Sequence, residues 1–163
     1  MCKVGHANIK KVMKENPGSI FASELSLHLY YHDMCDVECP ELSLLYILQM
    51  LSREKKTLSQ TVAPLKKYFH SGEKNFTVEN KQEIINKIEK KYSAVGGAFG
   101  GKKAEEVSHL DGLWMKFYWG WFSVRASNTE PVLRLNVEAK TKDKMEAKVR
   151  EISQIILEKF VRH

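Results

Sequence analysis

The sequence lacks several features that would place it in a membrane or a secretory pathway. No apolar run approaches the roughly 18–20 residues that a membrane helix needs. The segment Met1 to His6 has no apolar core of a signal peptide. The chain has three cysteines, and an odd number argues against a disulfide framework. We therefore expect a cytoplasmic protein without a membrane segment.

A strong excess of one charge is also missing. The chain has 26 Lys and Arg against 20 Asp and Glu, for a net charge of +6. Its hydrophobic fraction is 43% and its charged fraction is 28%, which is ordinary for a soluble globular protein and excludes a disordered one. The moderately basic balance suits an anionic ligand, such as a nucleic acid, an acidic lipid or a sugar phosphate. Most of the Lys residues are expected on solvated helix faces.

Hydrophobic periodicity predicts a mixture of helices and strands. Apolar residues at helical spacing predict helices, and alternating apolar residues predict strands. Pro40 stands where the first helical residue is expected. A Gly-rich stretch, Ser93 to Lys103, is expected to be a loop, and it lacks the residue order of a phosphate-binding P-loop. The predicted helices cover residues 8–15, 40–52, 58–65, 80–92 and 141–160, and the predicted strands cover 75–78, 114–118, 121–125 and 132–138.

The order of these elements predicts two domains of different kinds. Phe69-His70-Ser71-Gly72 is typical of a boundary or linker. Residues 1–66 are expected to form a βαβα-like part of an α/β domain, too small to be comfortable alone. Residues 67–163 are expected to form a complete small α+β domain, with helices on one face of an antiparallel sheet.

The turn from Arg125 to Pro131 has the composition of an anion site. Arg125 offers two parallel donors that match the oxygens of a phosphate. Ser127 and Thr129 offer hydroxyl groups, and Asn128 offers an amide. Ser and Asn favour turns in which backbone N–H groups point inward. Composition alone leaves a second interpretation open, in which this is a polar turn that contacts only water.

The wider pattern resembles the α-D-phosphohexomutase family, in particular bacterial phosphomannomutases and phosphoglucomutases. The resemblance covers nearly the whole chain. The motif Arg125-Ala126-Ser127-Asn128-Thr129-Glu130-Pro131 is similar to the phosphate-binding loop of the family's last domain. Ser23-Glu24-Leu25-Ser26-Leu27-His28 is similar to the sugar-binding loop of its third domain. Further matching stretches are Val4-Gly5-His6 with Ile9-Lys10, Asp111-Gly112-Leu113, Leu133 to Glu138, and Trp121-Phe122.

The resemblance implies an intramolecular phosphotransferase, which is an isomerase of mannose or glucose 1- and 6-phosphates. In this family a phosphoserine of the first domain, assisted by Mg²⁺, exchanges its phosphoryl group with the sugar. By resemblance, Glu24 and Ser26 hold sugar hydroxyls, and His6 and His28 lie near the sugar or its phosphate. The residues that hold the non-reacting phosphate are then Arg125, Ser127, Asn128 and Thr129. The shared hydroxyls of mannose and glucose leave the preferred sugar open.

Two departures from the family pattern are visible. Ser23 and Leu27 stand where the family usually has Gly, and Leu27 removes backbone freedom beside Ser26. The chain also contains no Ser-His-Asn phosphoserine loop and no Asp-Gly-Asp metal loop. We therefore predict no catalytic or metal-binding residue in this chain and expect Mg²⁺ in a missing N-terminal half, which would be its protein partner. On this interpretation the chain is a truncated fragment that is inactive alone.

Three alternatives use other features of the sequence. The first is a stand-alone phosphosugar-binding module, which differs from the mutase only in having no upstream half. The second is a zinc module, because two His and two Cys would suit a tetrahedral site; its ligands would be His28, His32, Cys35 and Cys39. The third is a nucleic-acid binder that uses strand aromatics, although a basic stripe and a binding signature are missing; its aromatics would be Trp114, Tyr118, Trp119 and Trp121.

Overall fold

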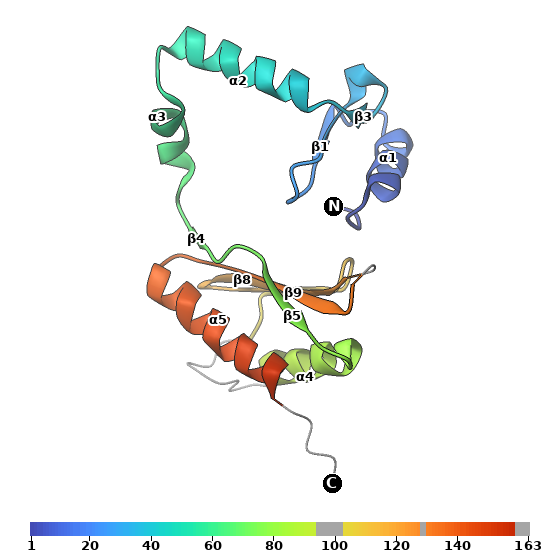
Figure 1. The fold of residues 1–163 in the computed structure, drawn as a ribbon, viewed down its shortest axis with the longest axis vertical. Coiled ribbons are helices and arrows are strands. Elements are labelled where there is room, and N and C mark those ends of the chain that lie inside the picture. The colour runs from blue at the N-terminus through green and yellow to red at the C-terminus, as the bar shows by residue number, and fades with distance from the viewer. Residues whose placement is uncertain (94–102, 128–129, 159–163) are drawn as a thin grey trace. The chain divides into compact units, whose positions relative to one another are not determined.

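The computed structural model describes residues 1–93, 103–127 and 130–158 (Figure 1). The chain divides into two compact units, Met1–Lys66 and Lys67–His163. The Gly-rich stretch, Asn128, Thr129 and the end of the last predicted helix lie wholly or largely outside the described residues.

The first unit is a small antiparallel sheet with helices before and after it. Its strands pair in the order β1-β2-β3, and its buried apolar core consists of Ile9, Met13 and Tyr30. Pro40 lies in the first turn of α2, as predicted, because its missing N–H and fixed φ suit that position. The elements are α1 (His6–Glu15), β1 (Phe21–Ser23), β2 (Leu29–Tyr31), η1 (His32–Met34), β3 (Val37–Glu38), α2 (Pro40–Glu54), α3 (Leu58–Val62) and η2 (Ala63–Leu65).

The α/β class is confirmed for this unit, but the order of its elements differs from the βαβα order. The unit starts with a helix, and its three strands follow one another in hairpins rather than alternating with helices. Strands of two or three residues are too short to show an alternating pattern, so the positions of these strands were not predicted. The predicted helix after Pro40 is present, yet its apolar side chains Leu44, Leu45 and Leu48 are more than half exposed.

The second unit is a six-stranded antiparallel sheet with two helices on one face (Figure 1). The strand order is β4-β9-β8-β7-β6, and β5 also pairs with β9. This arrangement confirms the predicted α+β architecture. The elements are β4 (Phe69–His70), β5 (Lys74–Thr77), α4 (Lys81–Ser93), β6 (Glu106–Ser108), β7 (Leu113–Phe117), β8 (Gly120–Ala126), β9 (Val132–Ala139) and α5 (Lys142–Leu157).

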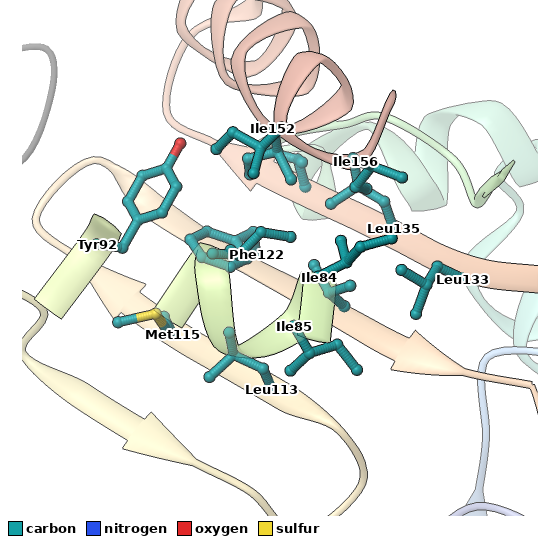
Figure 2. Packing of buried hydrophobic residues seen from close by; sticks show 14 of the residues in the cluster. Ile84, Ile85, Tyr92, Leu113, Met115, Phe122, Leu133, Leu135, Ile152 and Ile156 are labelled. Carbon is teal, nitrogen blue, oxygen red and sulfur yellow. The ribbon is translucent and has the colours of Figure 1, made fainter. Parts of the chain in front are cut away.

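The core of the second unit lies between the sheet and the two helices (Figure 2). Every second residue of β7, β8 and β9 points to the helices, as strand geometry requires. Burial of this apolar surface is the main force that holds the layers together. The buried residues that carry the packing are Ile84, Ile85, Ile88, Leu113, Met115, Phe122, Val124, Leu133, Leu135, Val137, Ile152, Ile155 and Ile156.

Candidate functional site

The turn between β8 and β9 is anchored on both of its sides. The two strands pair from Gly120 opposite Ala139 to Ala126 opposite Leu133, and the Ser127 amide then donates to the Val132 carbonyl at 3.0 Å. The Ser127 side chain is buried, and its Oγ accepts a hydrogen bond from the Glu130 amide at 3.2 Å. The turn therefore leaves a rigid scaffold, as a binding loop requires.

A lysine from α4 fixes the same turn from outside the hairpin. The Lys81 Nζ donates to the carbonyls of Ser127 and Glu130, each at 3.1 Å. These two hydrogen bonds satisfy the carbonyl oxygens at the two ends of the turn. Sequence reasoning missed Lys81, because 46 residues separate it from Ser127.

Two arginines face each other across β8 and β9 beside this turn. Arg125 and Arg134 are direct cross-strand partners, and like charges at such positions repel. Nearby carboxylates offset the repulsion: Arg125 Nε lies 3.7 Å from Asp111 Oδ2, and Arg134 contacts Glu73 at 3.2 Å and Glu130 at 2.9 Å. About a quarter of each arginine side chain is exposed. Both guanidinium groups therefore stay partly accessible beside the turn, each with a carboxylate partner, and Arg donors suit an anion.

A glycine allows the loop that carries Asp111 to approach Arg125. Gly112 has a φ of +83°, and a Cβ there would lie 2.6 Å from the Val124 carbonyl oxygen and 2.9 Å from the Arg125 Cα. Only glycine fits so close to the neighbouring backbone. The Asp111-Gly112 stretch thus has a structural reason to accompany Arg125.

In the first unit, the predicted sugar loop is the tight turn between β1 and β2. The Glu24 amide donates to the His28 carbonyl at 3.2 Å, and the Leu27 amide donates to the Glu24 carbonyl at 3.0 Å. Ser26 is exposed at the tip of the turn. Leu27, which stands in the family's Gly position, has a φ of 65°. The turn therefore keeps the left-handed conformation for which Gly is suited, at a cost to the Leu backbone.

Leu27→Gly is expected to stabilise this turn. Relief of the left-handed strain is worth about 1 kcal/mol, which makes the open form of the turn about fivefold less populated. Amide hydrogen exchange of Glu24 and Leu27 measures the effect, and slower exchange is the expected result. Leu25→Gly is the matched control, because Leu25 is also exposed in the same turn but has no positive φ; it should speed exchange. Faster exchange in Leu27→Gly would contradict the strain.

Three further side chains of the first unit converge on one carboxylate, that of Glu38. The His28 Nδ1 lies 2.8 Å from Glu38 Oε2, and the His6 Nδ1 lies 3.2 Å from Oε1. The Tyr30 hydroxyl donates to Oε1 at 3.0 Å. His28 Nε2 also lies 3.8 Å from Glu24 Oε1. The structure therefore brings together the predicted residues His6, Glu24 and His28.

This network changes the acidity of its members. The hydrogen bond from His28, with that from His6, lowers the pKa of Glu38 to about 2. The same bond to Glu38 raises the pKa of His28 above its ordinary value. Burial and the bond to Glu38 raise the pKa of Tyr30 to about 12. Glu38 is therefore ionised at neutral pH, and it lies beside two imidazole rings that can take up a proton.

The four residues of the zinc alternative do not come together. His28 contacts Glu38, whereas His32 Nδ1 contacts Asp36 Oδ1 at 3.0 Å. Residues 1–93, 103–127 and 130–158 contain no group of three or more His, Cys, Asp or Glu side chains that could hold a metal ion. The four candidate zinc ligands therefore do not form a tetrahedral site.

The aromatic residues of the nucleic-acid alternative lie on different faces of the sheet. Trp119 is buried and stacks on Phe117, with ring centroids 5.2 Å apart. Trp114 and Trp121 lie near each other on neighbouring strands, at 6.5 Å, and Trp121 Nε1 donates to Glu138. Trp114 and Trp121 lie on β7 and β8, whereas Trp119 lies in the turn between these strands.

Comparison with known proteins identifies both units. Residues 1–68 match the family described as "Phosphoglucomutase/phosphomannomutase, alpha/beta/alpha domain III", and residues 73–155 match "Phosphoglucomutase/phosphomannomutase, C-terminal domain". A phosphomannomutase of Methanocaldococcus jannaschii is 40% identical over 94% of this chain and 32% of its own length. A phosphomannomutase of Escherichia coli K12 is 34% identical over 86% of this chain and 29% of its own length.

A solved structure shows the same fold. A phosphoglucomutase/phosphomannomutase family protein from Burkholderia thailandensis superposes with a TM-score of 0.73 and 23% identity, over 96% of this chain and 31% of that one. The two units therefore have the folds of the third and the last domain of a class of multidomain enzymes that act on sugar phosphates. It belongs to the α-D-phosphohexomutase family, and it spans about a third of the length of the relatives that it matches. No helix in the described part of the chain is long and apolar enough to cross a membrane.

Proposed function

We propose that this chain is the part of a phosphohexomutase that holds a hexose phosphate by its hydroxyls and its non-reacting phosphate. The Arg125 turn holds the phosphate, and the Glu24–His28 turn with His6 holds the sugar. The substrate class is mannose or glucose 1- or 6-phosphate, as family membership suggests. Reaction in the whole enzyme then transfers a phosphoryl group at the other end of the sugar.

The observation that carries the phosphate assignment is the anchored turn beside the paired arginines. A phosphate dianion placed there would separate the guanidinium charges of Arg125 and Arg134 and accept hydrogen bonds from Arg125. Lys81 already fixes the Ser127 carbonyl, so Ser127 itself needs little ordering on binding. Asn128 and Thr129 are proposed to complete the site, and both lie outside the described residues.

Binding of the distant phosphate supports catalysis in the whole enzyme without taking part in the chemical step. Energy from non-reacting parts of a substrate orients the reacting end. Glu24 can accept hydrogen bonds from vicinal hydroxyls, and Ser26 can donate and accept. The exposed position of Ser26 at the tip of its turn is compatible with that contact.

We expect the 163-residue chain to bind mannose 6-phosphate weakly and to leave it unconverted. NMR titration should move the amide signals from Arg125 to Glu130 at millimolar ligand. Arg125→Ala should weaken this binding by about 10- to 150-fold, since a charged hydrogen bond is worth about 1.5–3 kcal/mol. Phosphorus NMR of the same sample should show no mannose 1-phosphate, because the sequence contains no phosphoserine loop.

The control is Arg150→Ala, which removes an exposed arginine of α5 and the same net charge. It should leave the affinity within a factor of about two, because isolated surface charges act weakly. Amide signals that stay still at millimolar ligand would contradict the phosphate site. An equal loss of affinity in Arg125→Ala and Arg150→Ala would show that binding depends on net charge and not on a site at Arg125.

A further inference from the structure

The side chains of His6, His28 and Tyr30 all contact the carboxylate of Glu38. Sequence reasoning gave Glu38 no role. Tyr30 and Glu38 are direct partners in the β2–β3 ladder, so their side chains project from the same face. The first turn of α1 brings His6 to the same carboxylate across 32 residues of sequence. Glu38 therefore lies on β3, and its side chain contacts side chains of α1 and β2.

The two histidine contacts have the same chemical form. Each ring presents Nδ1 to Glu38, which favours a proton on Nδ1 and turns Nε2 away from Glu38. The His28 Nε2 then lies 3.8 Å from Glu24 Oε1, on another residue of the proposed sugar site. The His6 and His28 side chains are 60% and 47% exposed, so a ligand can reach both rings. Tyr30, by contrast, is fully buried, and its hydroxyl donates a hydrogen bond to the Glu38 carboxylate.

We propose that Glu38 is a positioning residue of the sugar site, which holds the rings of His6 and His28 with their Nε2 atoms available to a hexose phosphate. This inference rests on the proposed function, because the ligand is the one assigned there. Glu38 acts through the two imidazoles and makes no contact with the ligand itself. In metal sites, carboxylates orient ligating histidines in the same way, by accepting a hydrogen bond from the other ring nitrogen.

The charge of Glu38 gives the proposal a pH signature. The charged and titratable groups around His28 are Glu38 from β3, Glu24 from the turn, and His6 and Tyr30 through the shared carboxylate. Both carboxylates favour the protonated ring, which can donate from Nε2 to a phosphate or hydroxyl oxygen. Binding of the ligand should therefore be tighter below the raised pKa of His28 and weaken as pH rises through it.

The test uses the whole chain and two measurements on Glu38→Gln, Glu38→Asp and the unaltered protein. The first is the ligand-free pH titration of the His28 ring protons by NMR. The second is the affinity for mannose 6-phosphate across the same pH range. We expect Glu38→Gln to lower the pKa of His28 and to move the midpoint of the pH-dependent affinity downward with it. Glu38→Asp, which keeps the charge, should restore most of both.

Asp36→Asn is the matched control, because Asp36 forms a similar pair with His32 at 3.0 Å in the same unit. Its φ of 58° is tolerated by Asn, so the fold should persist. This variant should leave the His28 titration and the affinity unchanged. A loss caused only by damaged structure would appear in Asp36→Asn and in Glu38→Asp as well.

Each outcome decides between the two claims. An unchanged His28 titration in Glu38→Gln would overturn the positioning role. A lowered pKa without any change in the pH dependence of binding would also overturn it, while the proposed function would stand. Absence of binding by the unaltered chain would overturn the proposed function, and the ligand-free titration would still decide whether Glu38 controls the rings.

Discussion

Gly120→Ala is expected to destabilise the Lys67–His163 unit by about 3 kcal/mol or more, the range of severe core changes. Gly120 has a φ of +151°, and a Cβ there would lie 2.0 Å from the Glu138 carbonyl oxygen and 2.8 Å from the Ala139 Cα. These atoms belong to the backbone of β9, a central strand that pairs with β8 along its length. They cannot move without breaking the β8–β9 ladder.

Tryptophan fluorescence during urea unfolding measures this effect. All three tryptophans lie within or next to β7 and β8, so their signal reports the second unit alone. Gly72→Ala is the matched control: Gly72 has a φ of +66°, but no atom lies within 4 Å of its added Cβ. That change should cost only about 1 kcal/mol of backbone strain. Equal losses in the two variants would show that the contact with β9 is unimportant.

The long elements could be predicted from the sequence because their apolar residues repeat over enough positions. The strands β7, β8 and β9 alternate over five to eight residues, and α4 and α5 span 13 and 16 residues. The short strands β2, β3, β4 and β6 have two or three residues, which cannot show a period. The bend before β3 also uses Cys35 and Asp36 at positive φ, where no Gly or Asn signals a turn.

The sequence indicated candidate site residues only where they stand together in a motif. Arg125 and Ser127 stand together in a polar turn between two predicted strands, so local composition indicates them. Glu38 meets His6 and His28 through strand register and helix placement, and Lys81 reaches its turn across 46 residues. Such contacts depend on the tertiary fold, and no local pattern encodes them.

Lys148 is a clear case in which tertiary packing overrides residue preference. Lysine is almost never fully buried unless paired, and most Lys residues of this chain were expected on solvated helix faces. It is only 3% exposed on α5, a helix whose Ile152 and Ile156 are also buried. Its Nζ lies 2.7 Å from Glu151 Oε2, and 5.3 Å and 5.6 Å from the ring centres of Tyr92 and Trp119. Paired charge and aromatic faces together permit its burial.

Lys148→Met is therefore expected to destabilise the second unit by about 3–5 kcal/mol, because it leaves the buried Glu151 charge without its partner. The urea midpoint of tryptophan fluorescence measures this loss.

Two further variants separate burial of the charge from loss of the lysine side chain. The double change Lys148→Met with Glu151→Leu should recover most of the stability, because apolar replacement of both partners of a buried pair is often neutral. Lys142→Ala breaks the exposed Lys142–Glu146 pair on the same helix, where the side chains are 67% and 44% exposed, and should cost less than about 0.5 kcal/mol. If the double variant were as unstable as Lys148→Met, packing of the lysine stem would explain the loss, and the buried charge would not.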